Sequence, residues 1–236
     1  PNWVYVTSKI AALGLIMYAI VLLGIIIAIT IQLLSGYQDI QLEQYIGRGL
    51  IYYTIAYIYL AVLSCFFQVL ANNRMLGMLF FVIFMALVIL AKDVFGIEHI
   101  LISYGIAGIA APLSDMNAND RFITGGIWLR IYWGSIAGML LILTYKLWNR
   151  GILQPFKYRL RNLQIVNNKK VFYPIVSMFV LFAVSAGNIF YNTNILNQYR
   201  TASDVEQLKL NYEQAYRQYQ DLPMPRIVDV KIVVDI

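Results

Sequence analysis

The chain has 236 residues, of which 60% are hydrophobic and 13% are charged, and its formal net charge at pH 7 is +6. Soluble domains carry about 25% charged residues and disordered chains have low hydrophobicity, so both classes are excluded. The composition therefore predicts an integral membrane protein. Its one cysteine, Cys65, allows no disulfide within the chain.

Five stretches are long and apolar enough to cross about 30 Å of hydrocarbon, which takes about 20 helical residues. A shorter, glycine-rich apolar run at residues 100–112 is typical of a re-entrant or interfacial segment. We therefore expect an all-α membrane protein of five helices with a re-entrant outer segment at about 96–125. The predicted spans are 10–35, 49–71, 75–94, 126–148 and 172–191.

The loop charges predict the orientation of the helices. The connection at 149–171 and its flanks carry only bases, namely Lys146, Arg150, Lys157, Arg159, Arg161, Lys169 and Lys170. Because basic loops stay in the cytoplasm, alternation places the N-terminus inside and everything after the fifth span outside. Aromatic residues mark the inner end of the fourth span at Tyr145 and Trp148. Topology and contact with anionic lipid explain the net charge, so nucleic acid is not an expected partner.

The sequence changes character after the fifth span. Apolar or aromatic residues recur every three or four positions over 203–220, which predicts an amphipathic helix. Ser203 and Glu206 have the spacing of a capping box, and Pro223 ends the pattern. Strict alternation from Val228 then predicts a strand. We expect 192–222 to be an extracytoplasmic linker and 223–236 to begin a β domain that continues in a longer protein.

No catalytic or metal-binding motif is evident. The chain has neither a phosphate-binding G-x-x-x-x-G-K-[ST] loop nor H-E-x-x-H, and Glu98 beside His99 is explained by an interfacial position. Residues 115–120, "DMNAND", resemble the start of a calcium loop, but Asp120 and Gly126 occupy its glycine and bidentate-acid positions. No cofactor is expected in this chain, and its status as an enzyme stays open.

Two further features concern helix packing and ion transport. The spacing of Gly134 and Gly138 permits a close helix crossing, either within the bundle or between subunits. Charged residues within the spans lie about a turn from an interface, where long side chains can reach water. This placement argues against an ion channel or an ion-coupled transporter.

Three segments carry a resemblance to a known family. "PNWVYVTSKIAALG" is similar to the cytoplasmic entry into the third helix of ABC-2-type permeases. "PLSDMNANDRFITGGIWLRIYWGSIAGMLLILTYKLWNRG" resembles the S-D-M-N, W-x-x-x-Y-W and L-W-x-R-G pattern of such permeases fused to an M1-family (gluzincin) aminopeptidase-like domain. Residues 191–236 are similar to the linker and first strand of that domain. The chain thus resembles the C-terminal permease helices of such a fusion, with the earlier helices and the zinc ligands missing.

The resemblance implies a permease in the bacterial cytoplasmic membrane, paired with a second permease half or a second copy. A separate cytoplasmic ATPase would bind ATP, and zinc or peptidase activity would belong to a domain beyond residue 236. The implied coupling surface for the ATPase consists of Asn2, Trp3, Tyr5, Lys9, Arg150 and Lys157. The implied external gate, in the re-entrant segment, consists of Tyr104, Gly105, Gly108, Pro112 and Asp115.

The sequence leaves two functions open. The first is the permease portion of an ATP-driven transporter or exporter that carries an extracytoplasmic aminopeptidase-like domain. The alternative is a membrane anchor that holds such a domain outside the cytoplasm without transporting anything. The apolar spans do not identify a substrate.

Overall fold

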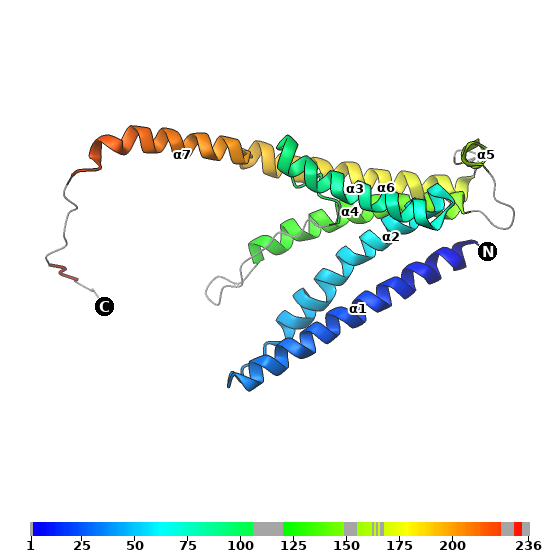
Figure 1. Ribbon diagram of the computed structural model, residues 1–236, viewed down its shortest axis with the longest axis horizontal. Coiled ribbons are helices and arrows are strands. Elements are labelled where there is room, and N and C mark those ends of the chain that lie inside the picture. Colours follow the sequence, from blue (N-terminus) through cyan, green and yellow to red (C-terminus); the bar gives the residue numbers. More distant parts are fainter. Residues whose placement is uncertain are drawn as a thin grey trace. The chain divides into compact units, whose positions relative to one another are not determined.

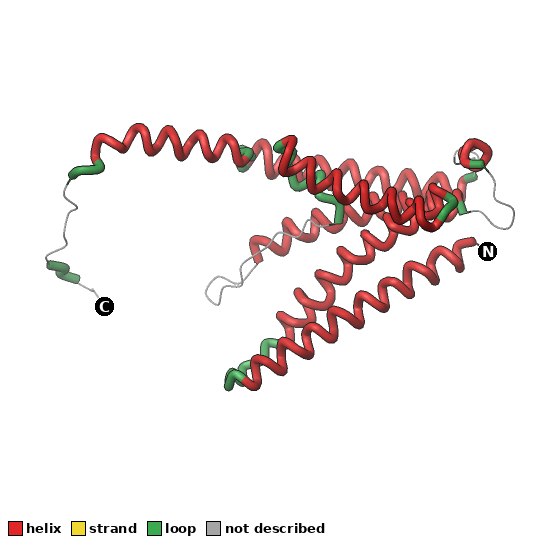
Figure 2. The backbone as a smooth tube through the Cα atoms, in the orientation of Figure 1, coloured by secondary structure: helices red, strands yellow, loops and turns green. Residues whose placement is uncertain are grey.

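The computed structural model describes residues 2–105, 120–148, 155–161, 163, 165, 168–222 and 229–232. Every regular element in this part of the chain is helical (Figure 2). The long helices are α1 (Asn2–Leu34), α2 (Tyr53–Ala71), α3 (Arg74–Phe95), α4 (Asp120–Leu147) and α6 (Lys169–Phe190). Each contains a stretch long and apolar enough to cross a membrane, which confirms the prediction of five such helices.

The shorter elements connect or extend the long helices. The π-helix η1 (Gln44–Tyr52) leads into α2, α5 (Phe156–Arg161) lies between α4 and α6, and the π-helix η2 (Tyr191–Leu196) prolongs α6. The chain divides into two units, residues 1–198 and 199–236. The second unit contains α7 (Ala202–Tyr216) and the 3₁₀ turn η3 (Arg217–Tyr219).

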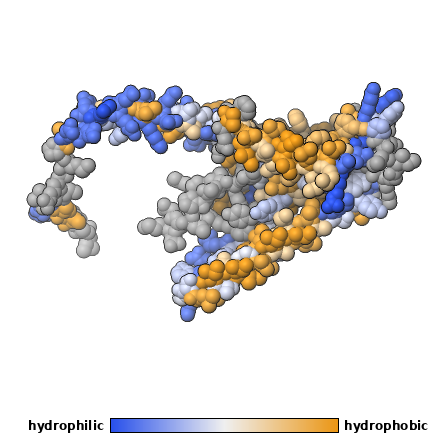
Figure 3. Space-filling model, in the orientation of Figure 1, coloured by the Kyte–Doolittle hydropathy of each residue, from blue (hydrophilic) through white to orange (hydrophobic). Residues whose placement is uncertain are grey.

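Helix α1 begins earlier than the sequence predicts. The first predicted span begins at residue 10, yet residues 2–9 form the first turns of the same continuous helix. Val6 is the one residue that α1 buries in this unit, and apolar side chains cover much of its length (Figure 3). Such a surface suits contact with lipid, because the transfer of apolar side chains from water to acyl chains is favourable in free energy.

The centre of the first unit is formed by α2, α4 and α6. Helix α4 packs along α6 and also contacts α2, which in turn contacts α1 and α3 (Figure 1). A Cβ added at Gly138 on α4 would lie 2.9 Å from Sδ of Met178 on α6, and one at Gly134 would lie 3.0 Å from Oη of Tyr59 on α2. The two glycines therefore face different helices of this unit.

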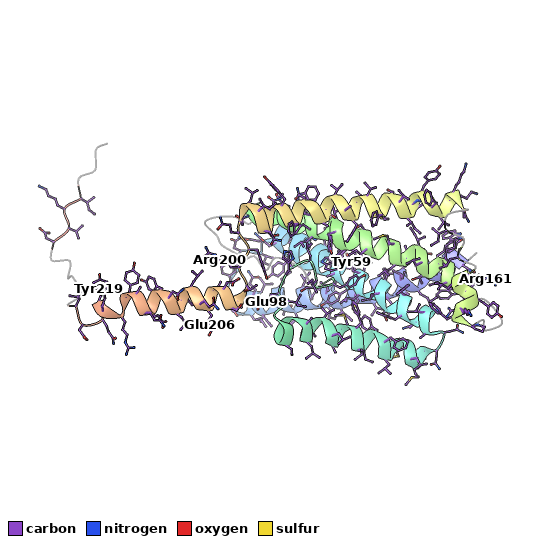
Figure 4. The ribbon with its side chains drawn as sticks, turned by 90° about the horizontal axis from the view of Figure 1, so that it is seen from above. Tyr59, Glu98, Arg161, Arg200, Glu206 and Tyr219 are labelled. Atoms are coloured by element: carbon purple, nitrogen blue, oxygen red, sulfur yellow. The ribbon has the colours of Figure 1, made fainter. Side chains whose placement is uncertain are left out.

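Successive long helices run in opposite directions, so their ends lie at two opposite ends of the bundle. The start of α1, the turn between α2 and α3, the end of α4, α5 and the start of α6 lie at one end (Figure 1). Figure 4 shows Arg161 at this end and Glu98 at the opposite one. The segments at this end are residues 2–9, 71–75, 146–148, 155–161 and 168–170, and we call it the basic end. They contain no acidic residue.

The structure does not show the predicted re-entrant segment in its described part. Gly96 ends α3 in the left-handed region at φ +61°, and residues 100–105 form turns. Tyr104 in these turns is 3% exposed and lies in the same buried cluster as Leu63, Leu129 and Trp133. Residues 106–112 lie outside the described residues. The segment that follows α3 therefore contributes a buried side chain to the bundle.

Two predictions for the second unit need correction. Helix α7 is present, but its capping box uses Thr201 and Asp204 instead of Ser203 and Glu206. Residues 229–232 form no strand, and Val230 and Ile232 are 65% and 77% exposed. An isolated strand has no partner for its backbone groups, which explains why alternation alone does not produce one. The remaining residues of the expected strand lie outside the described part.

Candidate functional sites

The first turn of α1 contacts the residue that follows α4. The side-chain amide Nδ2 of Asn2 donates a hydrogen bond to the backbone oxygen of Trp148, at 3.4 Å. Nζ of Lys9 lies 4.9 Å from the centroid of the Trp148 ring, within the range of a cation–π interaction. Two of the residues implied as a coupling surface, far from residue 148 in the sequence, are thus held at one place on the basic end.

The same turns of α1 present aromatic side chains outward. Val6 is 2% exposed, while Trp3 and Tyr5 are 57% and 46% exposed. The helix therefore fixes this segment through Val6, Asn2 and Lys9 and leaves two large rings at the surface. Aromatic rings on a fixed helix are typical of membrane interfaces and of protein contact sites.

Arg159 on α5 joins the ends of two spans. Its Nη1 donates hydrogen bonds to the backbone oxygens of Val69, at 2.6 Å, and Leu147, at 3.2 Å, and its Nη2 donates to that of Leu70, at 2.9 Å. The acceptors belong to the last turns of α2 and α4, where carbonyls have no partner within the helix and the helix dipole is negative. The guanidinium therefore caps both helices at once.

Arg159 is the only charged side chain that is buried among those the structure describes, at 7% exposure. Burial lowers the pKa of its guanidinium. The group nevertheless stays protonated, as arginine does throughout proteins. The sequence suggested only a topological role for this residue. In a connection without acids, helix-end carbonyls are the acceptors that remain for a buried guanidinium, but one sequence does not show which base turns inward.

The other bases of the connection do not share this environment. Lys157 and Arg161 on α5 and Lys169 and Lys170 at the start of α6 are exposed. Arg150, which the resemblance places in the coupling surface, lies outside the described residues. Of the predicted surface, Asn2 and Lys9 are therefore held against Trp148, Trp3 and Tyr5 are exposed beside them, and Lys157 is exposed on α5.

The second site is built around Tyr104 and lies near the middle of the helices that surround it. Its hydroxyl donates a hydrogen bond to the backbone oxygen of Tyr59 on α2, at 3.0 Å. The hydroxyl of Tyr59 donates to the backbone oxygen of Arg130 on α4, at 2.9 Å, and that of Tyr132 donates to the backbone oxygen of Leu101, at 3.2 Å. Hydrogen bonds from three tyrosines thus connect the segment that follows α3 with α2 and α4.

Ring contacts reinforce these bonds. The rings of Tyr104 and Trp133 meet edge to face with centroids 5.1 Å apart, and the centroid of Tyr132 lies 4.7 Å from that of Trp133. Tyr132 also stacks on Phe182 of α6 at 5.2 Å. Aromatic pairs in these geometries contribute about 0.5–1.5 kcal/mol each beyond the burial of their area. The cluster therefore fixes residues 100–105 against three helices.

Gly105 lies beside this cluster with φ +66°, a left-handed conformation that favours glycine. A Cβ there would lie 3.6 Å from the backbone oxygen of Ala56 and from Cβ of Tyr59. Of the predicted gate, Tyr104 and Gly105 are thus packed onto α2, while Gly108, Pro112 and Asp115 lie outside the described residues. Among the residues that the structure describes, no three His, Cys, Asp or Glu side chains gather to hold a metal ion.

Comparison of the chain with protein-family models, with curated proteins and with solved structures found no match.

Proposed function

We propose that this chain is the membrane-spanning permease portion of an ATP-driven transporter of the ABC type, in a bacterial cytoplasmic membrane. The observation that carries the proposal is the contact of Asn2 and Lys9 with Trp148, which joins the start of the first span to the end of the fourth. A permease without its own ATPase must receive the motion of a partner. A surface that links two spans provides a place to receive it.

The proposal places the basic end in the cytoplasm. The segments at this end contain basic residues and no acidic ones. This supports the orientation, since cytoplasmic loops carry an excess of Lys and Arg. The ATPase would then contact the first turns of α1, where Trp3 and Tyr5 offer rings at the surface. A push on these turns would pass to α4 through Trp148. The second unit would lie outside and lead into an aminopeptidase-like domain.

The Tyr104 cluster would serve as the external closure of the pathway. Its rings and hydrogen bonds bring together residues 100–105 and the middle turns of α2, α4 and α6. Opening the outer side would require these contacts to separate. The same packing would also suit a rigid membrane anchor for an extracytoplasmic domain, which is the alternative function.

Purification of the full-length protein from its own host separates the two functions. A transporter is expected to retain a protein with a phosphate-binding loop and to stimulate its ATP hydrolysis. The double variant Trp3→Ala/Lys9→Ala is expected to lose most of this association. Lys209→Ala/Tyr212→Ala on α7, which removes a base and an aromatic ring from the other unit, is the matched control.

An anchor gives a different result in the same experiment. If the intact protein is stable and functional in its host with no ATPase bound, the permease proposal is wrong. If the control variant on α7 loses the ATPase as completely as the variant on α1, the ATPase does not use the first turns of α1. Labelling of single thiols tests the orientation, since one at Lys157 should react only from the cytoplasm and one at Asp204 only from outside.

A further inference from the structure

The exposed side of α5 carries an apolar pair next to a basic pair. Phe156 and Leu160 are four residues apart and are 44% and 52% exposed. Lys157 and Arg161 are also four residues apart and are exposed. Residues four apart lie on the same side of a helix, so the two pairs form neighbouring stripes. An apolar stripe beside a stripe of Lys and Arg is typical of a helix that lies in a membrane interface.

Arg159 fixes the depth of α5. Its guanidinium bonds the carbonyls of Val69, Leu70 and Leu147, and these residues lie at the ends of two membrane-spanning stretches. The axis of α5 is therefore no farther from the ends of those stretches than the length of the Arg159 side chain. Side chains on the exposed side of a helix held there reach the lipid headgroups and the first carbons of the acyl chains.

The charge of this end favours an anionic ligand. The basic end also contains Arg74, Lys146, Lys169 and Lys170, and the sequence contains no acid between Asp120 and Asp204. Arg159 is engaged by carbonyls, so Lys157 and Arg161 are the bases of α5 that can reach a phosphate. Each Lys or Arg near an anionic surface strengthens lipid binding severalfold.

We propose that α5 is a binding surface for anionic phospholipid headgroups. Lys157 and Arg161 contact lipid phosphates, while Phe156 and Leu160 insert between the upper parts of the acyl chains. Arg159 acts as a positioning residue that holds the helix at this depth. A soluble protein would have to reach the level of the span ends to cover the apolar stripe, so the observations favour lipid. The proposal holds whether or not the chain transports a substrate.

The first test measures lipid-dependent stability of the full chain in detergent. Dioleoylphosphatidylglycerol is expected to raise the unfolding temperature more than dioleoylphosphatidylcholine does. Lys157→Gln/Arg161→Gln is expected to weaken the apparent affinity for phosphatidylglycerol on the order of tenfold. Lys209→Gln on α7 combined with Arg217→Gln in η3 removes the same charge elsewhere and is expected to leave this affinity unchanged. An unchanged affinity in the α5 variant, or an equal loss in the control, overturns the proposal.

A second arm of this test separates a lipid from a free anion. Inorganic phosphate is not expected to reproduce the rise in unfolding temperature, because the apolar pair binds only a ligand with acyl chains. The variant Phe156→Ser/Leu160→Ser is accordingly expected to weaken binding of phosphatidylglycerol although it keeps both bases. If inorganic phosphate produces the same shift, and the serine variant retains it, α5 binds a free anion and the lipid proposal is wrong.

The depth of α5 is tested in nanodiscs. Leu160→Cys in a Cys65→Ala background carries an environment-sensitive fluorophore, with Tyr212→Cys on α7 as the control position. Brominated phosphatidylglycerol is expected to quench the label at 160 and not the label at 212. If a water-soluble quencher reaches position 160 as readily as 212, α5 faces water. A water-facing α5, or one shielded only when a soluble protein is added, contradicts lipid binding.

Discussion

The hydroxyl of Tyr104, in the segment that follows α3, donates a 3.0 Å hydrogen bond to the backbone oxygen of Tyr59 on α2. Tyr104 is 3% exposed, so this bond ties a loop residue to the interior of the helical unit. The donor belongs to the segment, and the acceptor is a helix carbonyl. The Tyr104 ring can be buried and its hydrogen bond can form only when the segment that follows α3 packs against α2.

Substitution can separate two contributions of Tyr104 to stability, namely the hydrogen bond of its hydroxyl and the packing of its ring. Tyr104→Phe removes only the hydrogen bond and is expected to lower the free energy of unfolding by about 0.5–1.5 kcal/mol. Tyr104→Ala also leaves a cavity among Phe84, Trp133 and their neighbours and is expected to cost about 3–5 kcal/mol. Denaturant titration in detergent measures both, with Tyr18→Phe on the exposed surface of α1 as the control. Equal losses in the two Tyr104 variants would contradict the packing described.

Gly77 marks a close approach between α2 and α3. A Cβ at this position would lie 2.5 Å from Cα and 3.0 Å from the backbone nitrogen of Gln68. Since backbone atoms cannot move aside, Gly77→Ala must separate the helices and is expected to destabilise the protein by about 1–3 kcal/mol. Gly187→Ala on α6 is the control, because an added Cβ there has no atom within 4 Å.

The control variant Gly187→Ala has its own expected effect on stability. Alanine is favoured over glycine within helices by about 0.8–1.0 kcal/mol, so Gly187→Ala should be neutral or stabilising. Thermal unfolding in detergent compares the two variants. If both shift the midpoint in the same direction by similar amounts, α2 and α3 do not approach each other at Gly77.

The number of long apolar helices, and the connection whose charged residues are all basic, could be predicted from the sequence. The contacts between helices could not. Apolar length and helical period depend only on residues close together in the chain, so the stretch that forms α3 is evident from its own residues. The approach of Gly77 to Gln68 and the inward turn of Arg159 depend on residues from other helices. Tyr104 was singled out by resemblance, but its bond to Tyr59 needs the relative placement of two segments that no local pattern specifies.

The capping box of α7 shows a smaller error of the same kind. Ser203 and Glu206 fit the pattern of an N-terminal cap, and so do Thr201 and Asp204 two residues earlier. Both pairs satisfy the local rule, so the rule cannot choose between them. Residues 229–232 of the predicted terminal strand form no strand, for a different reason. Alternation describes one face of a sheet, but a strand forms only where another supplies its hydrogen bonds.

Arg159 is expected to be essential for the structure of the basic end. Arg159→Ala leaves three carbonyls of α2 and α4 without their shared donor and is expected to lower the free energy of unfolding by about 2–4 kcal/mol. Arg159→Lys keeps the charge but lacks the planar fork that reaches both helices, so it should recover less than half of this loss. Arg161→Ala, an exposed base two residues away, is the control.

Limited trypsin digestion gives a second readout for Arg159. Release of α5 from the helix ends should allow its backbone to unfold, so that trypsin can cleave after the exposed Lys157 and Arg161. Arg159→Ala is therefore expected to be cut in the connection at least several times faster than the parent. The wild-type chain should resist cleavage there under the same conditions. Equal digestion of both proteins, together with unchanged stability, would show that the three hydrogen bonds do not hold α5 in place.

Asp204 makes the start of α7 sensitive to acid. The side-chain and backbone hydrogen bonds from Thr201 lower the pKa of its carboxyl, aided by the charge of Arg200. A lowered pKa in the folded helix means that the carboxylate stabilises it fully above the unfolded value of about 3.9. This contribution should fade as the pH falls through the lower, folded pKa.

Carbon NMR of the Asp204 carboxyl in the full chain measures that titration. The Thr201→Ala variant removes one of the hydrogen bonds to the carboxylate and is expected to raise the pKa toward the ordinary value of an aspartate. Amides at the start of α7 should lose protection from hydrogen exchange in acid in the parent, relative to the same amides of Asp204→Asn. If Asp204 titrates alike in the parent and in Thr201→Ala, the capping box does not form in solution.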